Sequence, residues 1–141
     1  PVILLDEVFP GHTNAKNTLF GGRLMAIMDT AAGMSASKFA HREFVTVSVD
    51  ALKFRRPAFQ GDVIRTTARV VWTSPRTAGV YVISCRLSRS EWEGEEICSG
   101  FFFIVAVDES MKPINIPQFR PETDEDKALW TMADAAREAM R

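Results

Sequence analysis

The sequence predicts an α+β domain in which an antiparallel sheet curls around one long helix, with an extra C-terminal helix packed on the outside. Three observations support this fold class: an early helical pattern that is apolar nearly all round, four long β-like runs joined by short turns, and an acid-rich helical pattern at the end. A length of 141 residues fits one domain. We therefore assign residues 1–120 to a single domain and residues 121–141 to the helix that packs on it.

The long helix is predicted from Gly21 to about Phe39. Leu24, Met28 and Ala31 recur on one stripe, and the rest of the segment carries little charge. A helix that is apolar nearly all round is expected to be buried nearly all round. Because one unit of this kind leaves much apolar surface uncovered, the pattern also predicts self-association.

The middle of the chain has the period of two that is typical of strands. In "FVTVSVDALKF" three valines alternate with Thr46, Ser48 and Asp50, which predicts valines on one face of a strand and polar residues on the other. The last run is apolar on consecutive residues, as expected for a strand covered on both faces. Short turns between the runs predict an antiparallel meander. The runs are FVTVSVDALKF, VIRTTARVVW, VYVISCRLSRSEW and ICSGFFFIVAV, after a short strand at residues 2–9.

The segment "ETDEDKALWTMADAAREAMR" predicts the C-terminal helix, after a linker that contains several prolines. Thr123 and Asp126 have the spacing of a capping box, and the acidic first turn suits the helix dipole. Leu129, Met132 and Ala136 fall on the side that we expect to pack on the sheet.

Composition and charge argue against several classes of function. A net charge of −1 offers no basic footprint for nucleic acid or an anionic membrane surface, and no apolar run approaches the ~20 residues of a membrane span. Cys85 and Cys98 lack metal or disulfide spacing, and His12 and His41 lack metal-ligand spacing. The N-terminal residues do not resemble a signal peptide. We therefore expect a cytoplasmic protein with free thiols, no metal and no cofactor.

Gly21 and Gly22 stand where the long helix begins. The first N–H groups of a helix have no partner within the helix and carry the positive end of its dipole, and glycine lets a ligand approach that backbone closely. The arrangement suits a phosphate, a carboxylate or a developing oxyanion. Glycines here also permit close packing of the helix against a sheet, and from the pattern alone both explanations stay open.

Asp29 lies among apolar residues of the same helix, two turns after Gly22. Burial disfavours the charged form of a carboxylate and makes it a stronger general base. The alternative is a structural aspartate bonded to the backbone or to a hydroxyl. The helical rise separates the Gly22 N–H from Asp29 by about 10 Å, which is long for one small reacting group to touch both. Two copies paired antiparallel about a two-fold axis would set Asp29 of one copy against the glycines of the other.

The segment "TNAKNTLFGGRLMAIMD" resembles the helix-start motif of hotdog-fold acyl-CoA thioesterases, the family that includes the YciA-type enzymes and the brain-type cytosolic acyl-CoA hydrolases. The resemblance continues through "VTVSVDALKFRRPAFQGDVI", "FIVAVDESMKPINIP" and "PETDEDKALW", so it covers nearly the whole chain. The motif is carried by Asn14, Phe20, Gly21, Gly22 and Asp29.

This resemblance implies a hotdog fold and the hydrolysis of an acyl-CoA thioester to a free acid and CoA, without a metal. It implies that Asp29 activates or orients the attacking water, that Asn14 helps to position water or thioester, and that the Gly22 N–H polarises the carbonyl. Asn14 and Asp29 are then expected to come from different copies, in dimers grouped into hexamers. The implied CoA contacts are Val47, Ser48, Val49, Arg76, Thr77 and Ala78, with Arg55 or Arg56 joining Arg76 at the phosphates.

The sequence departs from the family pattern at two places. Asn17 replaces the usual glycine of the loop, and asparagine tolerates the left-handed conformation better than most residues, so we expect the turn to survive. In "SPRTAG", Pro75 looks inserted and Ala78 stands where serine is common in the family. These two departures affect the implied contacts with the CoA phosphates and not the implied chemistry. Two other functions stay open: a non-catalytic module that binds acyl-CoA, and a dehydratase or hydratase, which typically needs a histidine beside the helix.

Overall fold

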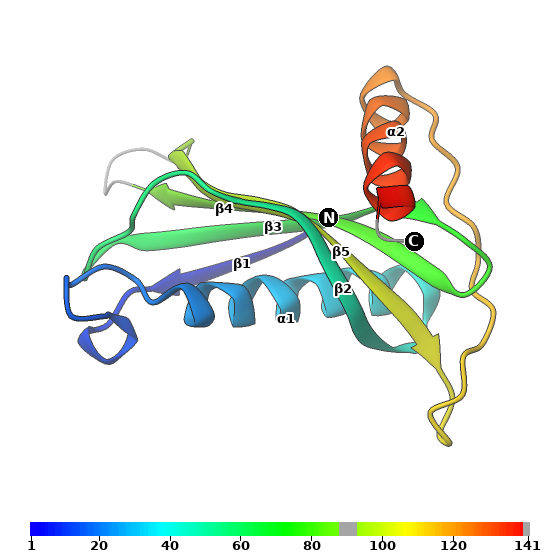
Figure 1. Cartoon of the computed structure of the whole chain (residues 1–141), viewed down its shortest axis with the longest axis horizontal. Coiled ribbons are helices and arrows are strands. Elements are labelled where there is room, and N and C mark those ends of the chain that lie inside the picture. Colours follow the sequence, from blue (N-terminus) through cyan, green and yellow to red (C-terminus); the bar gives the residue numbers. More distant parts are fainter. Residues whose placement is uncertain (88–92, 140–141) are drawn as a thin grey trace.

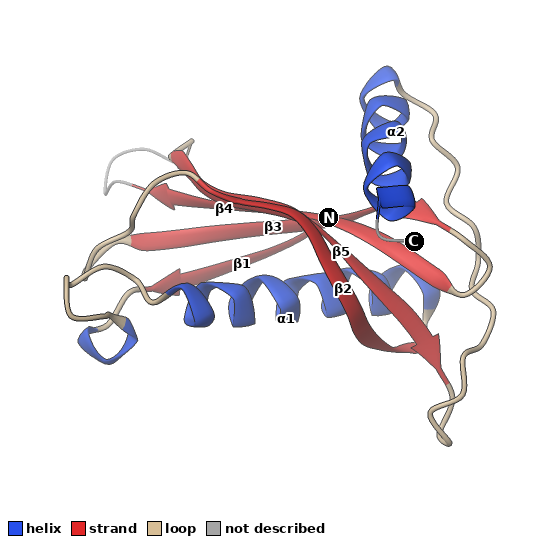
Figure 2. Cartoon of the chain, viewed as in Figure 1, coloured by secondary structure: helices blue, strands red, loops and turns tan. Residues whose placement is uncertain are grey.

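The computed structural model describes residues 1–87 and 93–139 and shows a five-stranded antiparallel sheet with one helix on each face (Figures 1 and 2). The last five residues of the run VYVISCRLSRSEW, predicted as strand, lie outside the described residues. None of the helices in the described part of the chain is long and apolar enough to cross a membrane. The elements are β1 (Val2–Glu7), η1 (Pro10–His12), α1 (Gly21–Ala40), β2 (Glu43–Phe54), β3 (Val63–Thr73), β4 (Thr77–Leu87), β5 (Glu95–Val107) and α2 (Asp124–Ala139).

The predicted fold class is confirmed, but the predicted meander is wrong for β2. The strand order is β1-β3-β4-β5-β2, so β2 pairs with β5 and forms one edge of the sheet. The connection to β3 does not turn back as a hairpin. Its first residue, Arg55, donates its N–H to Ile97 O at 2.8 Å, and the carbonyl of Ala58 then accepts from Leu19 N at 2.8 Å. The chain therefore crosses the end of the sheet beside the start of α1.

A β-bulge at Val47 changes which residues of β2 share a face. Thr46 pairs with Ile104, whereas Ser48 pairs with Phe103, so Val47 has no partner in the register. The predicted alternation across this point is therefore wrong. Thr46 shares the face of Ile104, which belongs to the inner core, and Ser48 shares that of Phe103, which belongs to the outer cluster.

The inner core lies between α1 and the concave face of the sheet. Its largest buried side chains include Phe102, Met28, Ile64 and Ile104. The expectation that α1 is buried nearly all round is wrong for the single chain, because the sheet covers only one side of it. The exposed residues of α1 are Gly22, Arg23, Ala26, Asp29, Thr30, Met34, Ser37 and Lys38.

The outer face of the sheet carries α2. A second cluster forms where Trp72 and Phe103 meet Ala133 and Ala136 of this helix, so β5 is covered on both faces as predicted. The capping box is also confirmed: Asp126 N donates to Thr123 Oγ1 at 3.0 Å, and Thr123 N donates back to the Asp126 carboxylate at 3.5 Å. Of the three residues predicted to pack on the sheet, Met132 is instead exposed, and Ala133 takes the buried position.

Candidate active site

The start of α1 leaves backbone donors open. Phe20 is the N-cap in an extended conformation, and no side chain caps the helix. Its carbonyl accepts from Arg23 N at 3.0 Å and from Leu24 N at 3.2 Å. Within the described part of the chain, the N–H groups of Gly21 and Gly22 have no acceptor. Two donors at the positive end of a helix of 20 residues therefore remain free to bind an anion.

Gly22 lies in close contact with the ring of Phe20. A Cβ atom added at Gly22 would stand 2.7 Å from a carbon of that ring, which is closer than real Cβ atoms approach. The ring itself is 58% exposed and borders the open donors. An alanine at this position would therefore require the exposed Phe20 ring to shift.

Asn14 organises the loop that leads into the helix. Its Oδ1 accepts from Lys16 N at 2.9 Å and from Thr18 N at 3.3 Å, and its Nδ2 donates to Thr18 Oγ1 at 2.8 Å. Asn17 has φ = 61°, which confirms that asparagine takes the left-handed position of the turn. The side chain of Asn14 is exposed, and one hydrogen of its amide has no partner within the described residues.

Asp29 lies on the exposed side of α1, so the expected burial of this carboxylate is not found in the single chain. Thr46 of β2 donates its hydroxyl to Asp29 Oδ1 at 2.5 Å. The bulge at Val47 follows directly after Thr46 and lets this one hydroxyl face α1 while Ser48 faces away. The contact fixes the carboxylate and leaves Oδ2 without a partner within the described residues.

Asp29 and Gly22 share the exposed side of one continuous helix, and the helical rise separates them by about 10 Å. One chain therefore brings Asp29 to Thr46 but does not bring Asp29 to the open donors of Gly22. A site shared by Asp29 of one copy and Gly22 of another remains a prediction.

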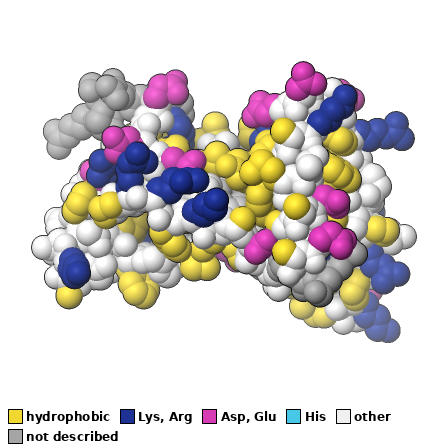
Figure 3. All heavy atoms as spheres, turned by 45° about the horizontal axis from the view of Figure 1, so that its top comes forward, with side chains coloured by type: hydrophobic (Ala, Val, Ile, Leu, Met, Phe, Trp, Pro, Cys, Tyr) yellow, Lys and Arg dark blue, Asp and Glu magenta, His cyan; other side chains and the backbone are white. Residues whose placement is uncertain are grey.

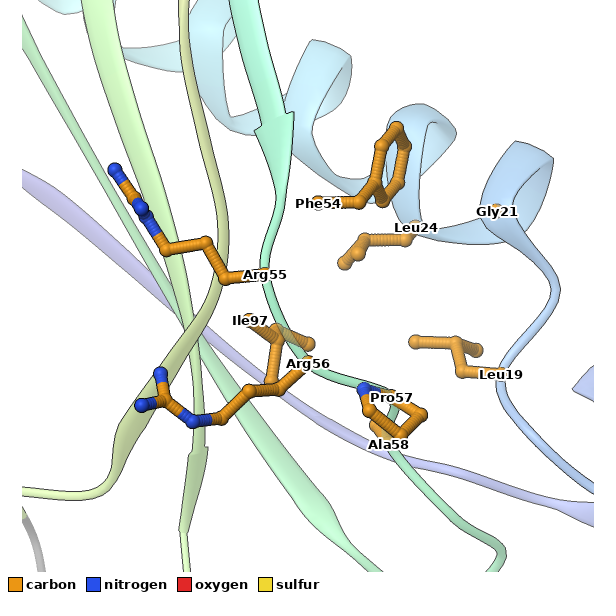
Figure 4. Close-up of a pocket in the computed structure, with 9 residues that line it drawn as sticks. All are labelled: Leu19, Gly21, Leu24, Phe54, Arg55, Arg56, Pro57, Ala58 and Ile97. Carbon is orange, nitrogen blue, oxygen red and sulfur yellow. The ribbon is translucent and has the colours of Figure 1, made fainter.

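A cavity of about 380 Å³ lies beside the start of α1 (Figure 4). Its apolar part is formed by side chains from the loop before α1, from α1 itself and from the end of β2. Figure 4 shows that the guanidinium groups of Arg55 and Arg56 extend away from this apolar part, toward β5. The lining residues are Leu19, Gly21, Leu24, Phe54, Arg55, Arg56, Pro57, Ala58 and Ile97.

The predicted phosphate contacts do not come together within one chain. Arg76 lies in the turn between β3 and β4, beside Val105 of β5, whereas Arg55 follows the pair Phe54–Cys98 at the other end of β5. Both arginines are exposed. One phosphate group therefore cannot contact Arg76 and Arg55 of the same chain.

The other predicted CoA contacts differ in accessibility. Val47 is 49% exposed at the bulge, whereas Thr77 and Ala78 are buried. Ser48 and Val49 are half-buried on opposite faces of β2. The Ser48 hydroxyl is buried and has no hydrogen-bond partner within the described residues.

Histidines and cysteines take structural positions. His12 is half-buried beside the start of α1: its Nδ1 accepts from Phe9 N at 3.3 Å, and its carbonyl accepts from Phe20 N at 2.8 Å. His41 is the left-handed C-cap of α1, with φ = 55°. Burial, with a smaller effect of Glu96, raises the pKa of the Cys98 thiol to about 11, so this thiol is inert at neutral pH. Within the described residues, no three His, Cys, Asp or Glu side chains form a metal-ligand cluster.

Comparison with known proteins identifies the family. The family model of the thioesterase superfamily matches residues 16–89. A Bacillus subtilis relative, described as the uncharacterized acyl-CoA thioester hydrolase YkhA, is 36% identical over 132 residues, which cover 94% of this chain and 77% of the relative.

Two solved structures have the same fold over almost the whole chain. A hexameric acyl-CoA thioesterase, solved in its apo form, has a TM-score of 0.89 at 35% identity and covers 98% of this chain and 88% of its own. An acyl-CoA hydrolase from Staphylococcus aureus, solved with butyryl coenzyme A, coenzyme A and coenzyme A disulfide, has a TM-score of 0.90 at 29% identity, with coverages of 99% and 85%.

The fold and the open helix start define a hotdog-fold thioesterase, as the sequence predicts. The chain belongs to the thioesterase superfamily.

Sequence reasoning missed Thr46 as a functional residue. The Staphylococcus aureus hydrolase was also solved as single variants in which an aspartate, an asparagine and a threonine are each replaced by alanine. The separations between those three positions equal those between Asn14, Asp29 and Thr46 in this chain. The signal available in the sequence was a hydroxyl residue early in β2, but nothing local indicated that it faces Asp29.

Proposed function

We propose that the protein hydrolyses acyl-CoA thioesters to a free carboxylic acid and CoA, and that its smallest active unit is a dimer. The observation that carries the proposal is the Asp29 carboxylate, fixed by Thr46 on the open side of α1, the helix whose first N–H groups have no acceptor. The names of the relatives support the substrate class. The reaction requires neither a metal nor an organic cofactor.

In the proposed mechanism, Asp29 accepts a proton from a water molecule while the water oxygen attacks the thioester carbonyl. The carbonyl oxygen becomes an oxyanion and is stabilised by the Gly22 N–H. Asn14, with its free amide hydrogen, helps to position the water or the thioester. Collapse of the tetrahedral intermediate breaks the C–S bond, and the departing thiolate takes up the proton held by Asp29.

Two copies supply one site in this proposal. The open side of α1 carries small residues such as Gly22 and Ala26 together with the exposed Met34, and β2 forms a sheet edge. An antiparallel arrangement covers this side and sets Asp29 of one copy near Gly22 of the other. It also directs Arg76 of one copy toward Arg55 of the other, which suits the phosphates of CoA. The hexameric neighbour supports a further assembly of such dimers.

A thiol-release assay tests the function. Wild-type protein is expected to release free thiol from acyl-CoA substrates, and Asp29→Asn is expected to lower kcat by about 10²- to 10⁴-fold, because the base is lost. Acyl-CoA binding without turnover in the wild type would instead indicate a binding module. Turnover that Asp29→Asn does not reduce would exclude Asp29 as the base.

Mixed dimers test the shared site. Subunits with Asp29→Asn are combined with subunits with Asn14→Ala, each inactive or weak alone. Because each mixed dimer contains one site with both residues intact, we expect it to recover part of the wild-type activity. Absence of any recovery in confirmed mixed dimers would show that Asn14 and Asp29 of the same chain serve one site.

A further inference from the structure

We propose that Glu96 is a positioning residue that orients both arginines at the rim of the cavity for the nucleotide phosphates of CoA. The inference rests on the proposed function, and it assigns to Glu96 a role in selecting CoA thioesters over thioesters that lack the nucleotide. It follows from the contacts of Glu96 at the start of β5, where the ends of β2 and β5 meet.

Glu96 contacts the two arginines with different groups. Its side-chain Oε2 accepts the Nε–H of Arg55 at 2.5 Å, and its backbone carbonyl accepts from Nη1 of Arg56 at 3.1 Å. Arg55 is also tied to β5 by its backbone N–H to Ile97 O at 2.8 Å. One residue therefore sets the direction of two neighbouring guanidinium groups, and both extend to the same side of the cavity (Figure 4).

The contact with Arg55 leaves most of its donors open. A guanidinium group has five N–H donors, and Glu96 engages only the one on Nε. The four on the two Nη atoms have no partner within the described residues. The side chain is 49% exposed. Because the planar group can rotate little once Nε is held, its outer edge points outward as a ready donor pair for a phosphate.

A hydrogen bond from Ser99 fixes the Glu96 carboxylate in place. Ser99 donates its hydroxyl to Glu96 Oε2 at 3.2 Å. The carboxylate is only 29% exposed, so it is less mobile than a typical surface glutamate. Figure 3 shows basic and acidic side chains close together at the end of the visible face opposite α2. The neighbouring Glu95 mainly binds Arg86, at 2.9 Å, and lies 3.8 Å from Arg56.

The position of the arginines decides which part of the substrate they contact. The apolar side of the cavity suits acyl or pantetheine groups, whereas the guanidinium groups extend from its rim. A substrate with the same acyl group on pantetheine carries no nucleotide phosphates. Its binding is therefore expected to be insensitive to the orientation of Arg55 and Arg56.

The experiment compares steady-state kinetics of three proteins on matched acyl-CoA and acyl-pantetheine substrates. Glu96→Ala is expected to raise KM for acyl-CoA by about 10-fold, the loss of roughly one charge-assisted hydrogen bond, with kcat and the acyl-pantetheine KM unchanged. Glu96→Gln keeps an acceptor for Arg55 and is expected to stay within about 2-fold of wild type. Glu109→Ala removes an exposed acid at the other end of β5 and serves as the charge control.

Each other outcome overturns the proposal. A lower KM for acyl-CoA in both Glu96 variants would make Glu96 a competitor of the phosphates, and equal changes for both substrates would make its role merely structural. Calorimetric titration with CoA gives a readout without turnover: Glu96→Ala should weaken CoA binding about 10-fold, and unchanged binding would refute the proposal. Because this titration needs no hydrolysis, failure of the proposed function is recognised separately.

Discussion

The two helices lie on opposite faces of one sheet and begin in opposite ways. The N-terminus of α2 is closed by the reciprocal bonds of Thr123 and Asp126, and Arg69 of β3 binds Asp126 at 2.8 Å. The N-terminus of α1 has no side-chain cap and leaves the N–H groups of two glycines open. Because the chain caps α2 with side chains, the absence of such a cap on α1 is specific to that helix. It leaves the first N–H groups of α1 available to a ligand.

The two helices also differ in how far their middle parts are covered by the rest of the chain. Trp72 and Phe103 cover the side of α2 that bears Ala133, and Trp72 donates its Nε1–H to Asp134 at 3.1 Å. On α1, the side opposite the sheet carries Asp29 and small residues without cover from the same chain. A helix that only stabilises the fold is anchored by its own domain, whereas α1 keeps one side free.

Substitution of Gly22 should have the largest effect in this comparison. In Gly22→Ala the added Cβ forces the Phe20 ring to move and obstructs the open donors, so we expect kcat/KM to fall by about 10²-fold. Thermal stability should not fall, because alanine favours a helix more than glycine does. Gly11→Ala, which meets nothing within 4 Å, is the control for kinetics and unfolding. Undiminished turnover in Gly22→Ala would separate the helix start from the chemistry.

Removal of the hydroxyl that orients Asp29 should have an intermediate effect. Thr46→Val keeps the shape of the side chain but loses the bond to Asp29 Oδ1, so kcat is expected to fall by about 10-fold with little change in Tm. Thr67→Val, at a half-buried strand position, tests for a general effect of such a change. Equal losses in both variants would contradict a specific role of Thr46.

Loss of the cap on α2 should have the smallest effect on activity and a measurable effect on stability. Thr123→Ala removes the acceptor for Asp126 N, so the free energy of unfolding is expected to fall by about 1 kcal/mol while kcat and KM stay unchanged. Denaturant unfolding and the thiol-release assay measure the two quantities. A loss of activity would mean that α2 also supports the site.

Asp126, the second residue of this cap, should make the stability of the fold depend on pH. Burial acts to raise the pKa of Asp126, but hydrogen bonds from the N–H groups of Glu122 and Thr123 and the charge of Arg69 outweigh it, so the pKa lies below its ordinary value. A lowered pKa in the folded state contributes stability above the unfolded value of about 3.9, and this is lost as pH falls through the folded value. Asp126→Asn should lack this part of the acid transition, and a superimposable acid transition would contradict the assignment.

Features set by neighbouring residues were predictable from the sequence. The start of α1 at Gly21, the left-handed Asn17 and the capping box of Thr123 and Asp126 each depend on a few consecutive side chains. The resemblance to hotdog thioesterases added the fold and the family, which the comparisons confirm. The catalytic roles of Asn14, Asp29 and Gly22 remain predictions, which kinetic measurements on variants test.

Features that depend on distant pairing were not predictable. The partner of β2 is set by the crossing of residues 55–62, which looks like an ordinary turn in the sequence. The contact between Thr46 and Asp29 depends on a bulge, because the strand pattern alone put Thr46 and Ser48 on one face. The exposure of Asp29 could not be inferred either, since an apolar pattern does not distinguish cover by the same chain from cover by another copy.

The bulge at Val47 has a consequence for how this enzyme can be altered. The extra residue shifts the alternation of β2 by one position. Thr46, before the bulge, faces α1 and binds Asp29, and Val49, after it, packs against the core. The two halves of the strand are thus free to vary under separate constraints. An engineer can vary Val47, which is 49% exposed and has no partner in the register, without changing the core, whereas deletion of a paired residue such as Val49 would turn the side chains that follow to the other face.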